Sequence, residues 1–255
     1  MVTVSGLPKA TLRERCDLAV EWVARGYRAV KFAAVVSDEG VVREMAALRE
    51  ALGPDIQIMA DLHWRYSAPD AIKLIRRLAE YDLAFAEAPC QPEDLEGQVA
   101  VARAGVAPVA LGEELRTAFE YRPRFEARAM GVIQPEIGHT GVVEFMRICD
   151  MAQTFHIPVM PHASISCEIF MAASLHAAST LRHMPFHEYQ HSIFDKNLAL
   201  VTGGMACGKG SYTVPPGPGL GVEPTTGCSG MFAPIRGPGS RKPYRGKTSL
   251  VMFLF

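Results

Sequence analysis

Three acidic side chains follow one another at equal distances along the chain, each at the end of a short apolar run. Asp61 ends IQIMAD, Glu87 ends LAFAE and Glu113 ends PVALGE, and both intervals are 26 residues (87 − 61 and 113 − 87). A spacing of about 25 residues fits one strand, one helix and the return to the next parallel strand. The three acids are therefore predicted to meet at one edge of a parallel sheet, where carboxylate oxygens could bind Mg²⁺.

The same spacing continues with an acid and a histidine. VIQPE ends at Glu136 and IPVMPH ends at His162, again 26 residues further on (162 − 136). A histidine works as a general base when a partner fixes its tautomer and raises its basicity, and an acid on the neighbouring strand can do both. Lys31 lies near the end of another apolar run, AVKF. Because an unpaired lysine is costly to bury, a functional role is favoured for it.

Helical patterns fill the intervals between these strands. Amphipathic helices are predicted over residues 11–26, 41–52, 68–81, 95–104, 116–128, 142–155 and 165–180. A strand in VTVSGLP brings the number of strand ends to seven, and an eighth strand is expected after residue 190. Alternating strands and helices specify an α/β fold, here a TIM-like (β/α) barrel, whose catalytic groups lie at the carboxyl ends of its strands.

Glycine and proline become frequent beyond Gly203, and these residues disfavour regular helices and central strands. We therefore predict a catalytic barrel over residues 1–200, a loop-rich segment that closes the barrel over 201–226, and an irregular tail over 227–255.

Composition excludes several classes of function. The 255 residues are 49% hydrophobic and 21% charged, with a formal net charge of −1, which is enough apolar material for one barrel-sized domain. No basic stripe indicates nucleic-acid binding, no apolar stretch approaches the roughly 20 residues that cross a bilayer, and no leader follows Met1. We expect a cytoplasmic enzyme that binds a small molecule and neither nucleic acid nor membrane.

The ordered strand ends resemble a known family. Lys31, the runs MAD, FAEAP and LGEE, and the QPEIGHTG and MPHAS stretches are similar to the barrel domain of the enolase superfamily, in its mandelate racemase and muconate-lactonizing branch. The likeness extends from about Ser5 to Pro224. It implies Mg²⁺ held by three acids, a base dyad, and a glutamate near the last strand that hydrogen-bonds the substrate carboxylate. These map onto Asp61, Glu87 and Glu113, onto Glu136 with His162, and onto Glu188 in HEYQHS.

The resemblance also implies a reaction. In this family, removal of the proton beside a carboxylate gives an enediolate, whose charge Mg²⁺ stabilises. Many members carry K-x-K where this chain has Lys31-Phe32-Ala33, so a second base is missing and racemisation is disfavoured, although Lys31 can still polarise the substrate carboxylate. The acid at Glu136 is usually an aspartate.

Two motifs narrow the reaction further. Asp61-Leu62-His63 resembles the D-x-H of acid-sugar dehydratases, in which the histidine protonates a departing hydroxyl, and QPEIGHTG resembles sugar-lactone cycloisomerases. Both reactions are β-eliminations from a sugar-derived acid or lactone. The expected enzyme is therefore a lyase or isomerase.

Alternatives remain open at each position. Strand-end acids can serve only as ion-pair or helix-cap partners, His63 could lie at the surface, and HEYQHS around Glu188 could be an exposed turn. His139 and His187 are expected to be structural or solvent-facing. Family members carry a capping domain before the barrel, which we expect this chain to lack, so an inactive, truncated barrel acting as a metal-binding or scaffold protein is the second hypothesis. An exposed barrel mouth would favour a homo-oligomer.

Overall fold

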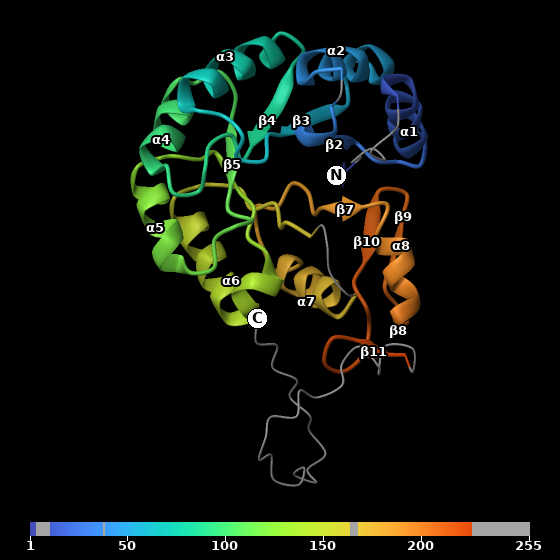
Figure 1. The fold of residues 1–255 in the computed structure, drawn as a ribbon. Helices are drawn as coiled ribbons and strands as arrows, with labels where there is room; N and C mark the ends of the chain where they lie inside the picture. The colour runs from blue at the N-terminus through green and yellow to red at the C-terminus, as the bar shows by residue number, and fades with distance from the viewer. Residues whose placement is uncertain (4–10, 38, 164–167, 226–255) are drawn as a thin grey trace, which may run out of the picture.

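The computed structural model describes residues 1–3, 11–37, 39–163 and 168–225. Seven short strands form one parallel sheet in the order β6-β5-β4-β3-β2-β1-β7. The strands are β1 (Val2–Thr3), β2 (Ala29–Ala33), β3 (Gln57–Asp61), β4 (Leu83–Glu87), β5 (Val109–Leu111), β6 (Val132–Ile133) and β7 (Tyr189–Gln190). Figure 1 shows them curving round a common centre with helices outside. This is the predicted TIM-like barrel.

The segment around Val159 lies between the two ends of this row of strands. Val159 forms a parallel bridge with Ile133 of β6, and the Met160 amide donates to the Ile133 carbonyl. On its other side, the Glu188 amide donates to the Pro161 carbonyl at 3.4 Å. The segment thus takes the place of the strand that was expected to end at His162.

The position predicted for the eighth strand is wrong. This strand was expected beyond residue 190, but β7 ends at Gln190 and pairs in parallel with β1. This strand was hard to recognise from the sequence because only two of its residues adopt regular pairing. Residues 4–8 of VTVSGLP and the tail predicted over 227–255 lie outside the described residues.

The predicted helices are confirmed, most of them within three residues at each end. They are α1 (Leu12–Ala24), α2 (Val41–Leu52), α3 (Ala68–Ala79), α4 (Leu95–Arg103), α5 (Ala118–Glu126), α6 (Ile137–Thr154) and α7 (Glu168–Ala178). Local signals explain the starts: Thr11 and Glu14 form a capping box at α1, and the Ser67 hydroxyl accepts from the Asp70 amide at α3.

One helix start was predicted too late. The α6 helix begins at Ile137 instead of residue 142, and its first turn is separated from the rest by Gly141, whose φ of 71° breaks the helical path. Gly138 and Gly141 interrupt the helical pattern of apolar residues, so this turn was not predicted from the sequence. The turn matters because Glu136 precedes it and His139 lies on it.

Short antiparallel pairs follow the barrel. The helix α8 (Phe194–Asn197) and a 3₁₀ turn (Leu198–Leu200) lead into β8 (Val201–Gly203), which pairs with β11 (Val222–Pro224). Between them, β9 (Ala206–Gly208) pairs with β10 (Ser211–Thr213). Tyr212 of β10 donates to the carbonyl of Glu188, next to β7. The segment thereby fixes the backbone at the end of the barrel.

The barrel interior has two layers. The apolar layer is a cluster of buried residues: Met1, Ala29, Met59, Phe85, Ala110, Val132 and Met160. Successive side chains of a strand face opposite sides, so the residue two positions further on also points inward. These next positions form what we call the polar layer: Lys31, Asp61, Glu87, Gln134, His162 and, two residues after Phe186, Glu188. A larger apolar core lies between the strands and the helices.

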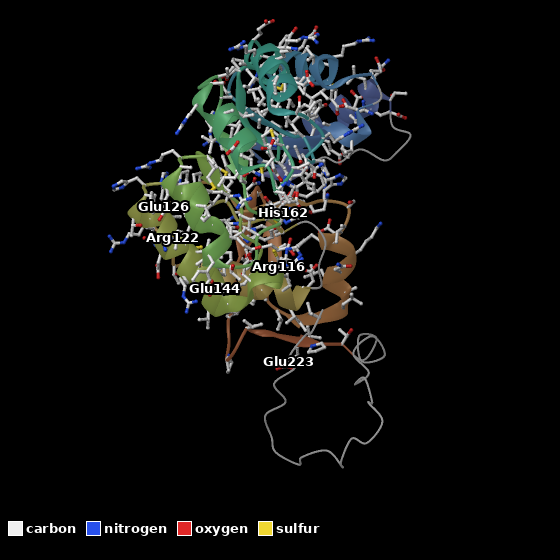
Figure 2. The ribbon with its side chains drawn as sticks, turned by 60° about the vertical axis from the view of Figure 1, so that its left-hand side comes forward. Arg116, Arg122, Glu126, Glu144, His162 and Glu223 are labelled. Atoms are coloured by element: carbon white, nitrogen blue, oxygen red, sulfur yellow. The ribbon has the colours of Figure 1, made fainter. Side chains whose placement is uncertain are left out.

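The outer helices carry ordinary surface charge. Figure 2 shows Arg122 and Glu126 on the outer face of α5, whereas His162 lies near the middle of the molecule. Among the residues described, none of the helices combines the length and the apolar character that crossing a bilayer requires.

Candidate functional site

A buried lysine occupies the centre of one half of the polar layer. The Lys31 ammonium lies 2.8 Å from both carboxylate oxygens of Glu87 and 3.0 Å from Glu188 Oε1, and all three side chains are at most 2% exposed. Glu188 is held from its other side, because its Oε2 accepts from the Ala163 amide at 2.9 Å. Glu188 is therefore an interior residue, not part of an exposed turn.

The other half of the layer is organised around His162. Its Nδ1 lies 2.5 Å from Glu136 Oε2, and its Nε2 lies 2.6 Å from Glu113 Oε2 and 3.7 Å from Glu188 Oε2. The predicted pair of Glu136 and His162 is thus in contact. A carboxylate on each ring nitrogen fixes the orientation of the imidazole.

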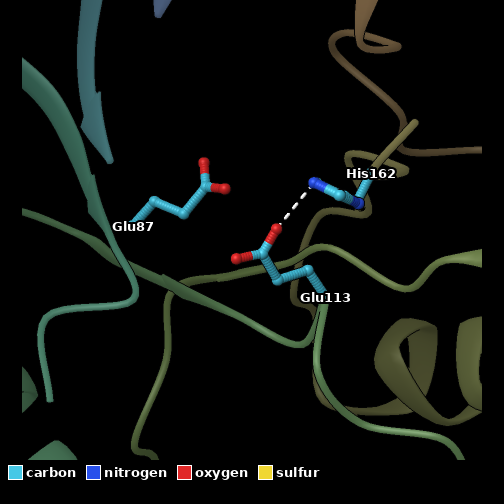
Figure 3. Close-up of side chains that lie close together, drawn as sticks. All are labelled: Glu87, Glu113 and His162. Atoms are coloured by element: carbon cyan, nitrogen blue, oxygen red, sulfur yellow. Dashed lines mark ion pairs between the residues drawn. The ribbon is translucent and has the colours of Figure 1, made fainter. Parts of the chain in front are cut away.

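Three of these side chains converge closely enough to share a metal ion. Glu87, Glu113 and His162 each offer one ligand atom, and these atoms lie within 4.8 Å of one another. Figure 3 shows the two carboxylates and the imidazole pointing toward one another from separate strand ends. Asp61, the remaining predicted metal ligand, is outside this group, although it is the register partner of Glu87 in the pairing of β3 with β4.

Asp61 contacts His63 instead. His63 Nδ1 lies 2.9 Å from Asp61 Oδ2, and the His63 backbone amide donates to Asp61 Oδ1 at 3.0 Å. The His63 backbone adopts a φ of 49°, which is uncommon outside glycine and turns the chain sharply after β3. The His63 side chain is about one-third exposed (34%), so it borders the mouth of the barrel and is accessible to a small molecule.

Two residues of the site were not recognised from the sequence. Gln134 of the polar layer donates from its Nε2 to Glu87 Oε2 at 2.8 Å. His139, expected to be structural or solvent-facing, lies with Nε2 3.4 Å from Glu136 Oε1 and Nδ1 3.0 Å from the Glu113 carbonyl. Gln134 could have been found from the sequence, because it lies two residues after Val132 and therefore faces the same side of the sheet as the other inward residues. No sequence pattern pointed to His139, because the glycines on either side of it made the first turn of α6 hard to predict.

Burial and neighbouring charges act in opposite directions on the pKa values of the buried residues Glu87 and Lys31. Burial raises the pKa of Glu87 to about 8, opposed by the charge of Lys31. Burial acts to lower the pKa of Lys31, but the charges of Glu188 and Glu87 outweigh it and raise that pKa well above its ordinary value. Contact with the Asp61 carboxylate raises the pKa of His63.

The pKa values of His162 and Glu113, whose side chains lie 2.6 Å apart, shift in opposite directions. Burial acts to lower the pKa of His162, but the charge of Glu188 and the bonds to Glu113 and Glu136 raise it well above its ordinary value. Burial acts to raise the pKa of Glu113, and the bond to His162 and the charge of that imidazole outweigh it, so the Glu113 pKa is lowered.

These residues fit a hard divalent cation. The possible donors in the polar layer and beside it are mostly carboxylate oxygens, which Mg²⁺ prefers. The acids outnumber the nearby lysine, and the raised pKa of Glu87 reflects how poorly its charge is tolerated when buried. Gln134 adds a buried carbonyl oxygen that has no partner among the described residues. A cation would relieve both the excess charge and the unmatched oxygen.

Comparison with known families agrees with this geometry. The model of the enolase C-terminal domain-like family matches residues 14–227. This chain belongs to that family. The match includes every residue of the site described above.

Several individual members of this family are similar to the chain in sequence and in structure. A D-galactonate dehydratase from Cronobacter sakazakii is 31% identical over 194 residues, which cover 72% of this chain and 50% of that protein. A solved member of the enolase superfamily from Agrobacterium tumefaciens is 45% identical with a TM-score of 0.87, covering 90% of this chain and 59% of the other. The 3,6-anhydro-D-galactonate cycloisomerase from Zobellia galactanivorans is 25% identical with a TM-score of 0.79, covering 88% and 62%.

The chain therefore spans about half the length of the curated relatives that it matches. The shared part is the barrel.

Proposed function

We propose that this barrel catalyses Mg²⁺-dependent removal of the proton beside the carboxylate of a sugar-derived acid, followed by β-elimination of a hydroxyl or a ring oxygen. The observation that carries the proposal is the position of His162: buried, held at Nδ1 by Glu136, and directed at Nε2 toward Glu113 and Glu188. Relatives named as a galactonate dehydratase and an anhydrogalactonate cycloisomerase support this class of substrate.

In this proposal, Asp61, Glu87 and Glu113 hold the ion. Bound there, Mg²⁺ would stabilise the negative charge that develops on the substrate carboxylate as the proton leaves. Glu113 can give its oxygen to His162 or to the ion, so loading of the site would free His162 Nε2 to accept the substrate proton. Glu136 keeps Nδ1 engaged and thereby fixes which nitrogen reacts.

Three further residues have roles at the substrate. Lys31 lies beside Glu87 and Glu188, where its ammonium would attract the substrate carboxylate. A hydrogen bond from Glu188 to that carboxylate requires a proton on the Glu188 carboxyl group. His63 borders the mouth on the β3 side and would protonate the departing oxygen. A dehydratase and a cycloisomerase share all these steps and differ in whether the leaving oxygen belongs to a hydroxyl or to a ring.

The test uses the full chain with a panel of aldonic acids, aldaric acids and sugar-acid lactones, with and without Mg²⁺. We expect a 2-keto acid only when Mg²⁺ is present, and exchange of the α-proton with heavy water that disappears in His162→Asn. Exchange that persists in this variant would transfer the role of base to Lys31.

A second variant separates the two halves of the reaction. In His63→Asn we expect the substrate α-proton to continue to exchange with heavy water while product formation stops, because removal of the proton precedes loss of the leaving group. If the wild-type chain folds and binds Mg²⁺ but converts no member of the panel, the result favours the alternative of a metal-binding barrel without catalytic activity.

A further inference from the structure

Gln134 lies in the polar layer, but only one of the two polar atoms of its side-chain amide has a hydrogen-bond partner among the described residues. It is 1% exposed and follows β6 two positions after the buried Val132, so it occupies the same inward position as Lys31 and Glu87 on their strands. Its Nε2 donates to Glu87 Oε2 at 2.8 Å. Glu87 has to be ionised to pair with Lys31 or to bind a cation, and an ionised carboxylate only accepts hydrogen bonds, so the NH₂ group faces Glu87 and the carbonyl oxygen faces away from it.

The carbonyl oxygen of Gln134 is the unusual group. Oε1 is buried and has no hydrogen-bond partner in the part of the chain that the structure describes. A buried polar atom without a partner costs about 1–3 kcal/mol, and native proteins rarely retain one without a use. Gln134 is bonded to a carboxylate of the Glu87, Glu113 and His162 group, so its side-chain amide lies beside the atoms that could share a cation.

We infer that Gln134 is a positioning residue of the metal site. Its NH₂ group holds Glu87 in the orientation that binds the ion, and its Oε1 accepts a hydrogen bond from a water molecule bound to that ion. The inference rests on the proposed function, because it requires the polar layer to bind a divalent cation. Mg²⁺ in proteins keeps several of its waters, and each of these waters is a strong donor for a carbonyl oxygen.

An amide suits this position better than a charged group. Glu87 Oε2 already receives a hydrogen bond from Lys31 at 2.8 Å, so a second cationic donor would further reduce the negative charge that Glu87 offers to the ion. A second carboxylate would repel Glu87 and lose the donor. The amide of Gln134 supplies one donor and one acceptor without changing the net charge. Residues that orient metal ligands in this way typically alter metal affinity 10–100-fold when they are replaced.

The experiment measures Mg²⁺ binding to the full chain by calorimetry, with Mg²⁺ as the only added ligand. Gln134→Met keeps the volume of the side chain and removes both polar groups. We expect Mg²⁺ to bind this variant about 10–100-fold more weakly than the wild type, while the melting temperature without Mg²⁺ stays the same or rises.

Gln98 provides a matched control. It is also fully buried and hydrogen-bonded, but its partners are the Gln91 carbonyl and the Arg124 guanidinium, outside the polar layer. Gln98→Met should lower the melting temperature and leave the affinity for Mg²⁺ unchanged. A Gln134→Met variant that binds Mg²⁺ within twofold of the wild type would overturn the inference and leave the proposed function intact. Failure of the wild type to bind Mg²⁺ would overturn both.

A second measurement on the wild type does not depend on the folding of any variant. In ¹H–¹⁵N spectra, the side-chain NH₂ signal of Gln134 should shift during Mg²⁺ titration with the midpoint found by calorimetry, whereas the signal of Gln98 should not move. A Gln134 signal that stays in place while Mg²⁺ binds would contradict the role assigned to its amide.

Discussion

The two layers of the barrel interior lie two residues apart on the same strands and have opposite chemistry. Met59 and Phe85 belong to the apolar layer, and two positions later Asp61 and Glu87 belong to the polar layer. Both layers are almost fully buried, so solvent exposure does not explain the difference. The apolar layer gains free energy from burial, whereas the polar layer loses solvation and recovers part of it through ion pairs. One layer therefore stabilises the barrel, and the other holds the residues to which the proposed function assigns the chemistry.

The largest expected effect comes from moving a charge into the apolar layer. Phe85→Asp removes a ring that is 2% exposed and places an unpaired carboxylate among Met59, Ala110 and Val132. Since an isolated buried charge is very costly, we expect a loss of more than about 5 kcal/mol, comparable with the whole stability of a domain. The chain should then be unfolded by circular dichroism.

Phe85→Leu is the control for this prediction. It keeps an apolar side chain of similar size and should cost only about 1–1.5 kcal/mol in urea unfolding. If the aspartate variant folds with a melting temperature near that of the leucine variant, the two layers do not differ as described.

The next effect tests whether the polar layer contributes stability. Glu87→Leu leaves Lys31 buried with fewer carboxylate partners, which should cost about 3 kcal/mol in urea unfolding. The double variant Lys31→Met, Glu87→Leu replaces the pair by apolar groups and should be more stable than Glu87→Leu alone. Mg²⁺ binding should be lost in both. A double variant that is no more stable than Glu87→Leu would contradict the view that Lys31 is poorly compensated once Glu87 is removed.

A third prediction concerns His187, which lies between Phe186 and Glu188. Its Nδ1 donates to the Glu188 carbonyl at 3.0 Å, Ser174 Oγ lies 2.9 Å from its Nε2, and burial lowers its pKa from 6.5 to about 4. The unfolded chain therefore takes up a proton at higher pH than the folded chain does. This contribution to stability is complete above pH 6.5 and is lost as the pH falls toward 4.

Between pH 7 and pH 5, the loss from His187 amounts to about 2 kcal/mol. Urea unfolding at both pH values should show this decrease in the wild type and a smaller one in His187→Gln. An equal decrease in the two proteins would assign the pH dependence to other groups.

The smallest effect is expected at the surface. Arg122 Nε lies 2.7 Å from Glu126 Oε1, one turn further along α5, but both side chains are more than half exposed (67% and 54%). Solvent screens such pairs, so Arg122→Ala should leave the melting temperature unchanged within error. A clear decrease would mean that this exposed ion pair contributes to the stability of the folded chain.

Much of the fold followed from local signals in the sequence. The run that ends at Asp61 predicts a strand whose end is confirmed, and α2 begins and ends where its pattern predicted. The errors arose where local signals were short or contradictory. β7 has two residues, and the first turn of α6 is bounded by Gly138 and Gly141. In each case contacts across the barrel hold a conformation that the local sequence only weakly favours.

The sequence by itself determined which residue types reach the mouth of the barrel, because strand alternation and a 26-residue interval fix the position of each side chain along its strand. Only the tertiary structure decided the partners: Lys31 with Glu87 and Glu188, and His162 between Glu113 and Glu136. It also revealed that Gln134 belongs to the site. The reason is physical, since periodicity fixes the direction of a side chain, whereas its contacts depend on how the strands curve and tilt as the barrel forms.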